Sequence, residues 1–416
     1  MENISAPSYY VNFSCIGAQC EDTCCSGWTV SIDSATYDKY DANTHPDLAP
    51  LFRLALKKNP DPGSDNHFGF LAMKPDGACH FQQEDRLCAI QKNLGAPALS
   101  TTCKLYPRYI NQFGAQREHA LGISCPEAAR LILLNPEPMQ FQMLAHDAAI
   151  DDGAFTSYRF PMQGDGDPAQ IAVLNDFRAV IVGILQYRDL SLGARMMLLG
   201  VLLDEADKVV SADTFAHASE LSPVLSAVVG MLARPAALQA QFEQIASNMP
   251  RKLAIVTSLT AQLLEGHTSA RLCECLLAAV EGLDAGPSDG RTPYEGCVEK
   301  YVRNYQTHYQ PFFKDKQHIF KNYLVNQVIT RLFPFTRGTY LELYRELTFR
   351  LSALQMLLVG MAAKHQGLDE RLVVQLFQSF ARKIDHNGRL LETLHESYKK
   401  DSKALFFDVM WLLKEA

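Results

Sequence analysis

The residues of this chain that could do chemistry are concentrated among its cysteines. Eight of the eleven lie in the first 125 of 416 residues, namely Cys15, Cys20, Cys24, Cys25, Cys79, Cys88, Cys103 and Cys125. In an intracellular protein such clustering is typical of thiolates gathered around a metal, because structural thiols need not be neighbours. The sequence therefore predicts a metal site built from its N-terminal third.

The spacing of these cysteines indicates which kind of metal site to expect. Sets of four thiolates suit either zinc or a [4Fe-4S] cluster. The usual structural zinc pattern is two Cys-x2-Cys pairs, and the chain has none. Successive spacings of five, four, one, 54, nine, 15 and 22 residues favour a group held by several loops. We favour an iron-sulfur cluster; zinc, mononuclear iron, and inert or redox-active thiols are the alternatives.

A thiolate-bound [4Fe-4S] cluster carries net negative charge, so cations and apolar rings are expected around it. Four cations lie in the same stretch as Cys88 and Cys103, namely Arg86, Lys92, Lys104 and Arg108. Three aromatic residues could keep water away from such a group, namely Trp28, Phe81 and Tyr106. The composition of the region therefore suits the predicted cluster.

The elements that must position the cysteines are short. Cys20 and Cys24 stand four residues apart, which predicts one face of a helical turn, while Cys25 points about 100° away. Apolar spacing predicts a helix within 30–58, capped by Asp33 or Ser34. The other expected elements are a strand or extended lead-in over 9–13, short strands at 68–73 and 79–81, a helix over 87–94 closed by Gly95, and a helix opened by Ser124, Cys125 and Pro126.

Beyond Asn135 nearly all of the sequence has helical periodicity, so the fold class we predict is mainly α, with a Cys-rich metal-binding N-terminal region followed by a larger helical body. Asp167 and Pro168 form a cap and first turn. The predicted divisions are 1–150 for the Cys-rich region, 151–168 for a linker, 169–282 for a helical domain, 283–296 for a second linker and 297–416 for a C-terminal helical region. Helices are expected near 192–210, 219–232, 236–248, 251–265, 269–282, 297–310, 315–332, 338–363, 368–384, 387–400 and 403–414.

Charge and hydropathy exclude several classes of partner. The formal net charge of -7 argues against a nucleic-acid surface, since duplex affinity depends on Lys and Arg neutralising phosphates. The first five residues have no positive or apolar region of a secretory signal. The longest apolar run, 196–203, is far shorter than the roughly 18 residues of a membrane span. We expect a cytoplasmic protein that binds neither nucleic acid nor membrane.

Several motifs resemble the flagellin lysine-N-methylase family. The motifs are Phe13-x-Cys15-x4-Cys20-x-Asp22-x-Cys24-Cys25-x-Gly27-Trp28, Leu87-Cys88-x-Ile90-Gln91, Thr102-Cys103-x2-Tyr106-Pro107-Arg108, Cys125-Pro126-Glu127, Asn322-Tyr323-Leu-Val-Asn326-Gln327 and Phe333-Pro334-Phe335. This resemblance runs from about residue 8 to the end. Over the first 130 residues the chain is also similar to small zinc- or iron-chelating domains.

The resemblance implies a cytoplasmic enzyme that moves methyl groups from S-adenosylmethionine to the ε-amines of lysines in the flagellin monomer, with a bound [4Fe-4S] cluster. All eight N-terminal cysteines match the family motif. Among them Cys20, Cys24, Cys88 and Cys103 are our first choice as direct ligands, because each lies on a helical or turn signal. No motif assigns a catalytic base or a pocket for the methyl donor.

The two usual signatures of S-adenosylmethionine chemistry are absent. A radical enzyme presents Cys-x3-Cys-x2-Cys, and here Gly27 stands where the third cysteine belongs. The nearest match to the Gly-x-Gly turn of ordinary methyltransferases is 164–166, which follows no hydrophobic strand and is interpreted as linker. A lysine ε-amine in water has a pKa of about 10.4 and must lose its proton before it can attack a methyl group.

Two C-terminal stretches are the remaining candidates for binding. Asn322 and Asn326 lie one helical turn apart beside Tyr323, so they are weak candidates for cofactor contacts, with a capped or solvated face as the alternative. The aromatic stretch Tyr301, Tyr305, Tyr309, Phe312 and Phe313 is interpreted as helix packing or as part of a substrate or cofactor pocket. Cys273, Cys275 and Cys297 are expected to be packed thiols.

Two other functions stay open from the residues alone. One is a non-catalytic zinc- or iron-binding adaptor, and the other is an iron-sulfur radical or redox enzyme that acts on a different substrate. Iron content, methylation of flagellin and release of 5'-deoxyadenosine would separate the three.

Overall fold

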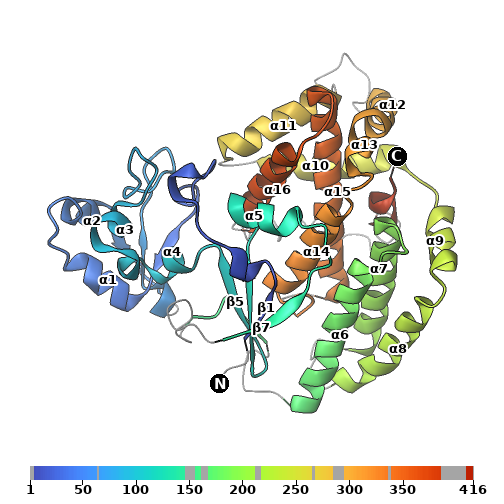
Figure 1. Cartoon of the computed structure of the whole chain (residues 1–416), viewed down its shortest axis with the longest axis horizontal. Coiled ribbons are helices and arrows are strands. Elements are labelled where there is room, and N and C mark those ends of the chain that lie inside the picture. The colour runs from blue at the N-terminus through green and yellow to red at the C-terminus, as the bar shows by residue number, and fades with distance from the viewer. Residues whose placement is uncertain are drawn as a thin grey trace.

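The computed structural model describes residues 4–62, 65–145, 155–160, 167–210, 217–264, 268–283, 295–335, 339–385 and 409–415. Helices make up most of these residues and the strands are short, so the predicted mainly-α fold is confirmed (Figure 1). A small lobe formed by the N-terminal region stands beside a larger helical body, and a five-stranded sheet lies between them (Figure 1).

The small lobe is built on a three-stranded antiparallel sheet in the order β2-β4-β3. It has its own hydrophobic core, in which the Phe52 ring packs against those of Tyr40 at 4.4 Å and Phe81 at 4.7 Å between ring centroids. Its elements are β2 (Val30–Ile32), α1 (Ser34–Asp41), α2 (Ala49–Ala55), β3 (Leu56–Lys58), β4 (Gly69–Leu71), α3 (Ala89–Leu94) and α4 (Thr101–Leu105).

Local signals in the lobe were predicted better than its element boundaries. The carboxylate of Asp33 accepts from the backbone N–H of Thr36 at 2.8 Å, and Gly95 ends α3 with a φ of 83°. The single helix predicted within 30–58 is instead two short helices flanked by strands, because the Asp33 cap begins a new element directly after β2. Residues 20–24 form bends and not the predicted helical turn, since Cys20 has an extended backbone.

The N-terminal lead-in and the third predicted strand also differ from expectation. Tyr10–Asn12 forms a short 3-10 turn in place of a strand. Cys79 takes part only in an isolated bridge with Met73, so 79–81 is no regular strand. The strand predicted over 68–73 is confirmed as β4.

The five-stranded sheet has the order β7-β1-β6-β5-β8 and joins the lobe to the helical body. Its strands are β1 (Ile4–Pro7), β5 (Arg108–Phe113), β6 (Gln116–Leu121), β7 (Phe141–Leu144) and β8 (Tyr158–Phe160). The β5–β6 hairpin was not predicted from the sequence. The segment 151–168, which was predicted as a linker, contains β8, and this strand pairs in parallel with β5.

The helical body contains the long helices that the periodicity predicted. They are α5 (Pro126–Leu133), α6 (Pro168–Gln186), α7 (Leu192–Val209), α8 (Leu221–Met231), α9 (Pro235–Gln244), α10 (Met249–Leu264), α11 (Ala270–Leu283), α12 (Glu295–Asn304), α13 (Gln310–Phe313), α14 (His318–Thr330), α15 (Tyr340–His365) and α16 (Glu370–Asp385). A π-helical turn, Tyr305–Tyr309, connects α12 to α13.

The centre of the body is α15, which packs most closely against α11. Gly282 and Gly360 allow this approach, since a Cβ added to Gly282 would lie 1.9 Å from the carbonyl oxygen of Gly360. Cys275 is buried in α11 and Cys273 and Cys297 are half-buried, as expected for packed thiols. The body therefore forms one continuous core with the five-stranded sheet.

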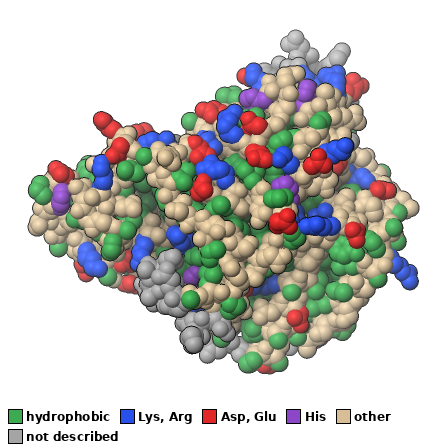
Figure 2. Space-filling view, in the orientation of Figure 1, with side chains coloured by type: hydrophobic (Ala, Val, Ile, Leu, Met, Phe, Trp, Pro, Cys, Tyr) green, Lys and Arg blue, Asp and Glu red, His purple; other side chains and the backbone are tan. Residues whose placement is uncertain are grey.

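Two described helices, α6 and α15, are long and apolar enough to cross a membrane by length and composition alone, and the bent pair 218–231 with 235–244 would make a third. The apolar window of α15 is wholly buried inside the protein, whereas only 33% of that of α6 is buried. On the face in Figure 2, cationic and acidic side chains are interspersed. The expected lack of contact with membrane and with nucleic acid stays a prediction.

Some predicted segments lie outside the described residues. They include the Gly-x-Gly stretch at 164–166, most of the second linker at 284–294, and the helix expected at 387–400. Of the last predicted helix, 403–414, only 409–414 is described, and 409–413 is helical. The division of the chain into independent domains stays a prediction.

Candidate metal centre

Five of the eight N-terminal cysteines belong to the core of the small lobe or lie around it. Cys79 is buried in that core, and Cys25, Cys88 and Cys103 pack against it. The loops that carry them are joined through the main chain, since the Cys79 N–H donates to the Cys25 carbonyl at 2.8 Å. The fifth, Cys24, precedes Cys25 directly. We call Cys24, Cys25, Cys79, Cys88 and Cys103 the five-cysteine group.

Burial and mutual repulsion disfavour the thiolate form in most of this group. Burial is the main cause that raises the pKa of Cys79 and Cys88, and burial raises that of Cys103 to about 12. The charge of Cys24 raises all three further. Sulfur atoms from three separate loops are therefore near enough to interact electrostatically.

The pKa values of Cys24 and Cys25 are shifted in opposite directions. The pKa of Cys24 is lowered to about 7, mainly by a hydrogen bond from the Cys25 thiol and in part by the Arg382 guanidinium. The same hydrogen bond, together with burial, raises the pKa of Cys25 far above its usual range. Cys24 is thus the thiol that carries negative charge most readily.

The other three cysteines form a second group, defined by Cys15, Cys20 and Cys125. Burial raises the pKa of Cys125, at the start of α5, to about 12, and the charges of Cys20 and Cys15 contribute. Burial also raises the pKa of Cys20, with a contribution from Cys15. Of our four first-choice ligands, the structure therefore brings Cys24, Cys88 and Cys103 together and places Cys20 with the second group.

The cysteines of the lobe suit a thiolate-bound cluster better than a single metal ion. Within the described part of the chain, no three His, Cys, Asp or Glu side chains are positioned to hold a metal ion. An iron-sulfur cluster binds each thiolate at a different iron, so its ligands stand further apart than those of a single ion. A cationic metal would also stabilise thiolates that burial disfavours. The residues present are therefore compatible with a cluster.

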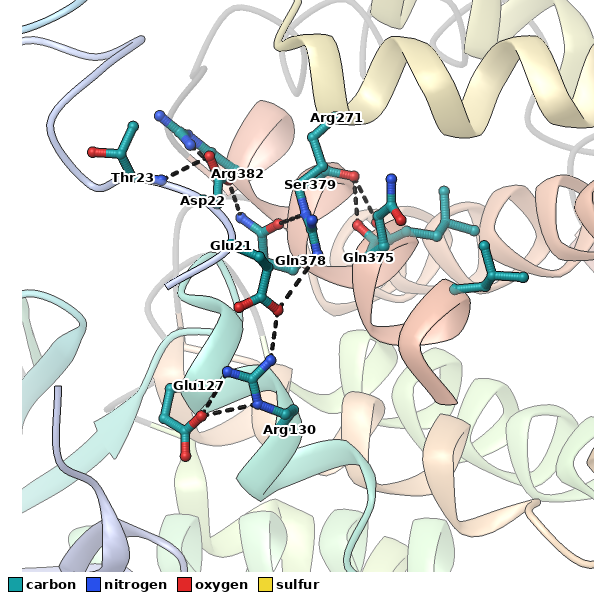
Figure 3. Close-up of polar contacts among 12 residues, drawn as sticks. Glu21, Asp22, Thr23, Glu127, Arg130, Arg271, Gln375, Gln378, Ser379 and Arg382 are labelled. Carbon is teal, nitrogen blue, oxygen red and sulfur yellow. Dashed lines mark hydrogen bonds and ion pairs between the residues drawn. The ribbon is translucent and has the colours of Figure 1, made fainter. Parts of the chain in front are cut away.

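A polar network fastens the loop that carries Cys20, Cys24 and Cys25 to α16 (Figure 3). The Asp22 carboxylate pairs with Arg382 at 2.7 Å and accepts from the Gln378 amide at 2.8 Å. Arg382 also donates to the Ser26 hydroxyl at 2.8 Å. Although burial raises the pKa of Asp22, the charge and hydrogen bonds of Arg382 bring it below its usual value.

The neighbouring Glu21 fastens the same loop to α5 and α11. Its carboxylate pairs with Arg130 at 2.5 Å and with Arg271 at 3.6 Å (Figure 3). Arg130 also pairs with Glu127 at 2.7 Å, and Arg271 donates to Gln378 at 2.9 Å. Three helices of the body thus hold one short cysteine loop.

Arg382, whose charge lowers the pKa of Cys24, was not predicted from the sequence. Arg382 lies at the far end of the chain, so no local pattern connects it to Cys24. Of the four predicted shell cations, Lys92 pairs with Asp85 on the surface, and Arg108 lies over the Phe13 ring at 5.2 Å. Arg86 does reach the cysteine loop, where it donates to the Asp22 carbonyl at 3.1 Å.

Two of the three aromatic residues predicted to shield the cysteines, Phe81 and Trp28, belong to the lobe core or pack against it. Phe81 is buried in the lobe core. The indole N–H of Trp28 donates to the Cys24 carbonyl at 2.8 Å, and its ring lies 5.7 Å from that of Tyr106. Trp28 is therefore tied to the cysteine loop at Cys24, and the exclusion of water from the cysteines by these rings stays a prediction.

The weak cofactor candidates on α14 have internal partners. The Asn322 amide donates to the carbonyls of Ile132 and Asn135 at 2.9 and 2.7 Å, and the Asn326 amide donates to Leu121 at 3.0 Å. Tyr323 is fully buried, and burial raises its pKa to about 12. These contacts join α14 to α5 and β6, so a cofactor contact there stays a prediction.

Comparison of the sequence with known proteins shows which family the chain resembles. Residues 178–412 match the model of the FliB lysine N-methylase C-terminal domain. The chain is 29% identical over 260 residues to the lysine-N-methylase of Salmonella typhimurium, which is 62% of this chain and 60% of that protein. It is 35% identical to the flagellar biosynthetic protein FliU of Salmonella muenchen, over 33% of this chain and 80% of that protein.

The matched part spans about 60% of the length of the lysine-N-methylase relatives, in Salmonella typhimurium and in Salmonella choleraesuis. No solved structure matches the chain. The family model covers more than half of the chain, including α14, α15 and the α16 helix that holds the cysteine loop. The chain therefore belongs to the FliB lysine N-methylase family, as its cysteine and C-terminal motifs indicated.

Proposed function

We propose that the chain is a protein-lysine N-methyltransferase that uses S-adenosylmethionine to methylate ε-amines of flagellin lysines in the cytoplasm. The match of residues 178–412 to the FliB lysine N-methylase model is the observation that carries this proposal. Relatives named lysine-N-methylase support the reaction, and the name of the flagellar biosynthetic protein FliU supports a flagellar substrate.

The reaction we propose is a direct displacement. The unprotonated ε-nitrogen of lysine forms a bond to the methyl carbon, while the bond between that carbon and the sulfonium sulfur breaks and its electron pair stays on sulfur. The products are methyl-lysine and S-adenosylhomocysteine, and one proton is released from the amine. Since lysine is mostly protonated at neutral pH, the site must favour loss of that proton through desolvation or a base.

We further propose that four members of the five-cysteine group hold a [4Fe-4S] cluster. Their convergence from four segments supports this assignment, as do the positive charge of Arg382 beside Cys24 and the burial that disfavours free thiolates. When bound, the cluster would cross-link the loops around residues 24, 79, 88 and 103. Displacement at a sulfonium methyl needs no redox centre, so we assign the cysteines a structural role.

The test combines iron-replete protein, monomeric flagellin and S-adenosylmethionine, with peptide mass spectrometry as the readout. We expect lysine peptides to gain methyl groups only when the methyl donor is present. Cys24→Ser and Cys103→Ser should lose iron and activity together, whereas Cys273→Ser, a half-buried thiol in α11, should keep both. Iron-replete wild-type protein that leaves flagellin unmodified would contradict the proposal and favour a metal-binding adaptor.

A further inference from the structure

The helical body contains a partly open cavity of about 620 Å³. The start of α7, the π-helical turn, α13, α15 and the final described residues line it. Cofactor pockets in proteins commonly measure about 300 to 1,000 Å³, so the space suits a molecule of nucleoside size or larger. In Figure 1, α7 and α13 lie across the helical body from the lobe of α1 to α4.

Stacked rings form one wall of this cavity. Tyr305 stacks on Tyr309 at 5.0 Å, and Tyr309 stacks on Phe313 at 4.5 Å between ring centroids. Phe320 extends the row at 5.2 Å from Phe313. Tyr305 and Tyr309 begin and end the π-helical turn, and such turns occur frequently at functional sites. We call this space the aromatic cavity.

A carboxylate meets these rings at the edge of the cavity. The hydroxyl of Tyr305 donates to the Glu415 carboxylate at 2.6 Å, and Glu415 is exposed. The negative charge of Glu415 also raises the pKa of the buried Tyr301, after burial itself. An acidic group beside aromatic faces is an arrangement that attracts cations, through direct charge and through the ring quadrupole.

The position of Glu415 is fixed by a fully buried lysine. The Lys252 ammonium donates to the Lys414 carbonyl at 2.7 Å and to the Gln355 side chain at 3.0 Å. Burial lowers the pKa of Lys252 to about 8. The Lys414 ammonium in turn donates to the Phe242 carbonyl at 3.0 Å. These bonds hold the end of the described chain against α10 and α9.

The cavity also presents a positive charge. Lys314 follows α13 directly, lines the cavity and is exposed. The aromatic cavity therefore offers an apolar ring wall, one carboxylate and one ammonium group. A lysine side chain of a protein substrate would use the rings and the carboxylate but has no group for Lys314 to bind.

Another cavity, of about 450 Å³, lacks such available charge. Its charged lining residues include Glu118 and Arg178, which form two hydrogen bonds with each other at 2.6 and 2.8 Å. His119 in the same lining is hydrogen-bonded to Tyr10 at 3.1 Å. The aromatic cavity is therefore the better candidate for a charged ligand.

We propose that the aromatic cavity binds S-adenosylmethionine. This assignment rests on the methyl transfer proposed above. This ligand combines a sulfonium cation, an aromatic base with ribose hydroxyls, and an amino-acid carboxylate. Tyr305, Tyr309 and Glu415 would receive the cationic sulfur, and Lys314 would pair with the carboxylate. The cysteine lobe lies on the other side of the body, which agrees with displacement and not with reductive cleavage at a cluster.

Isothermal titration of the full-length, iron-replete protein with S-adenosylmethionine and with S-adenosylhomocysteine tests this assignment. The second ligand has the same base and carboxylate but no charge on sulfur. Glu415→Gln should weaken binding of S-adenosylmethionine about tenfold and that of S-adenosylhomocysteine clearly less, because only the first is a sulfonium. Lys314→Ala, a change at an exposed position, should weaken both ligands alike.

Matched controls outside the cavity are Glu220→Gln and Lys364→Ala, both at exposed positions, and both should bind each ligand as wild type does. If Glu415→Gln and Lys314→Ala both bind the donor as wild type does, the cavity assignment is overturned, and the proposed methyl transfer still stands. Unchanged donor binding with a higher KM for flagellin would assign the cavity to the lysine substrate instead. Wild-type protein that neither binds the donor nor methylates flagellin would overturn both proposals.

Discussion

The carboxylate of Asp22 and the guanidinium of Arg382 form an ion pair of 2.7 Å between the cysteine loop and α16, near opposite ends of the chain. Both side chains are largely buried, at 13% and 11% exposure. This contact makes the placement of Cys24 and Cys25 depend on the C-terminal helical body. We therefore expect the lobe and the body to lose stability together when it is broken.

Arg382→Ala should lower the free energy of unfolding by about 3 kcal/mol, because it leaves the Asp22 carboxylate buried without its cation. Urea denaturation at neutral pH measures this loss. Arg371→Ala on the same helix is the matched control, since Arg371 is 71% exposed and its pair with Asp369 spans 3.9 Å. That control should change stability by less than about 1 kcal/mol. Equal effects of the two variants would show that the Asp22 pair does not hold the loop.

Iron content should divide the eight cysteines into the two groups seen in the structure. Serine variants of Cys24, Cys88 and Cys103 should lose bound iron, because Cys88 and Cys103 pack against the lobe core and the charge of Cys24 acts on both. Cys15→Ser and Cys125→Ser should retain it, since their charges interact with Cys20 in the second group. Anaerobic purification followed by iron analysis and visible absorbance gives the readout. Loss of iron from the Cys15 and Cys125 variants alone would place the ligands in the second group.

Acid should destabilise the helical body partly through Glu346. Burial raises the pKa of this carboxyl, but Arg350 and Arg331 outweigh it and bring the pKa to about 2. A lowered folded-state pKa stabilises the protein above the ordinary value near 4.5, and this contribution is lost as the pH falls toward 2. It is on the order of 3 kcal/mol.

Unfolding measured between pH 5 and pH 2 should therefore be less pH-dependent in Glu346→Gln than in wild type. The variant should also be less stable at pH 7, because the buried Arg350 loses the negative charge of the carboxylate that it contacts at 2.8 Å. Glu370→Gln, at an exposed pair with Lys316, serves as the control. Parallel pH profiles for wild type and Glu346→Gln would disprove this role.

Asn322 and Asn326 should contribute to stability through the carbonyl groups that they satisfy. Asn326→Ala removes the donor to Leu121 and should cost about 1 to 3 kcal/mol. Titration of the folded variant with S-adenosylmethionine separates this role from a cofactor contact. We expect unchanged affinity in the variant, whereas a loss of affinity without a loss of stability would restore these residues as cofactor ligands.

The sequence identified the helices and local caps because these depend on neighbouring residues. The 3.6-residue stripe of α6 and the caps at Asp33 and Gly95 are such signals. The β5–β6 hairpin was missed because its strands are short and carry several polar residues. The extended backbone of Cys20 was missed because a spacing of four residues also occurs without a helix.

Contacts between distant segments could not be read from sequence spacing. The cysteines were recognised as a set, but their division into two groups depends on how the loops fold around the lobe core. Arg382 became part of the site only through the packing of α16. The aromatic stretch containing Tyr305 and Tyr309 was interpreted as helix packing or as part of a substrate or cofactor pocket. The two rings stack on each other and line a cavity, and binding of a substrate or cofactor there stays a prediction.

The fate of an isotopically labelled methyl group tests the proposed reaction most directly. Flagellin monomer is incubated with the protein and S-adenosylmethionine whose methyl group carries three deuterium atoms. We expect methyl-lysine that retains all three deuterium atoms, with one S-adenosylhomocysteine formed for each methyl transferred. Unlabelled flagellin, or formation of 5'-deoxyadenosine with loss of deuterium from the methyl group, would contradict displacement by the lysine amine.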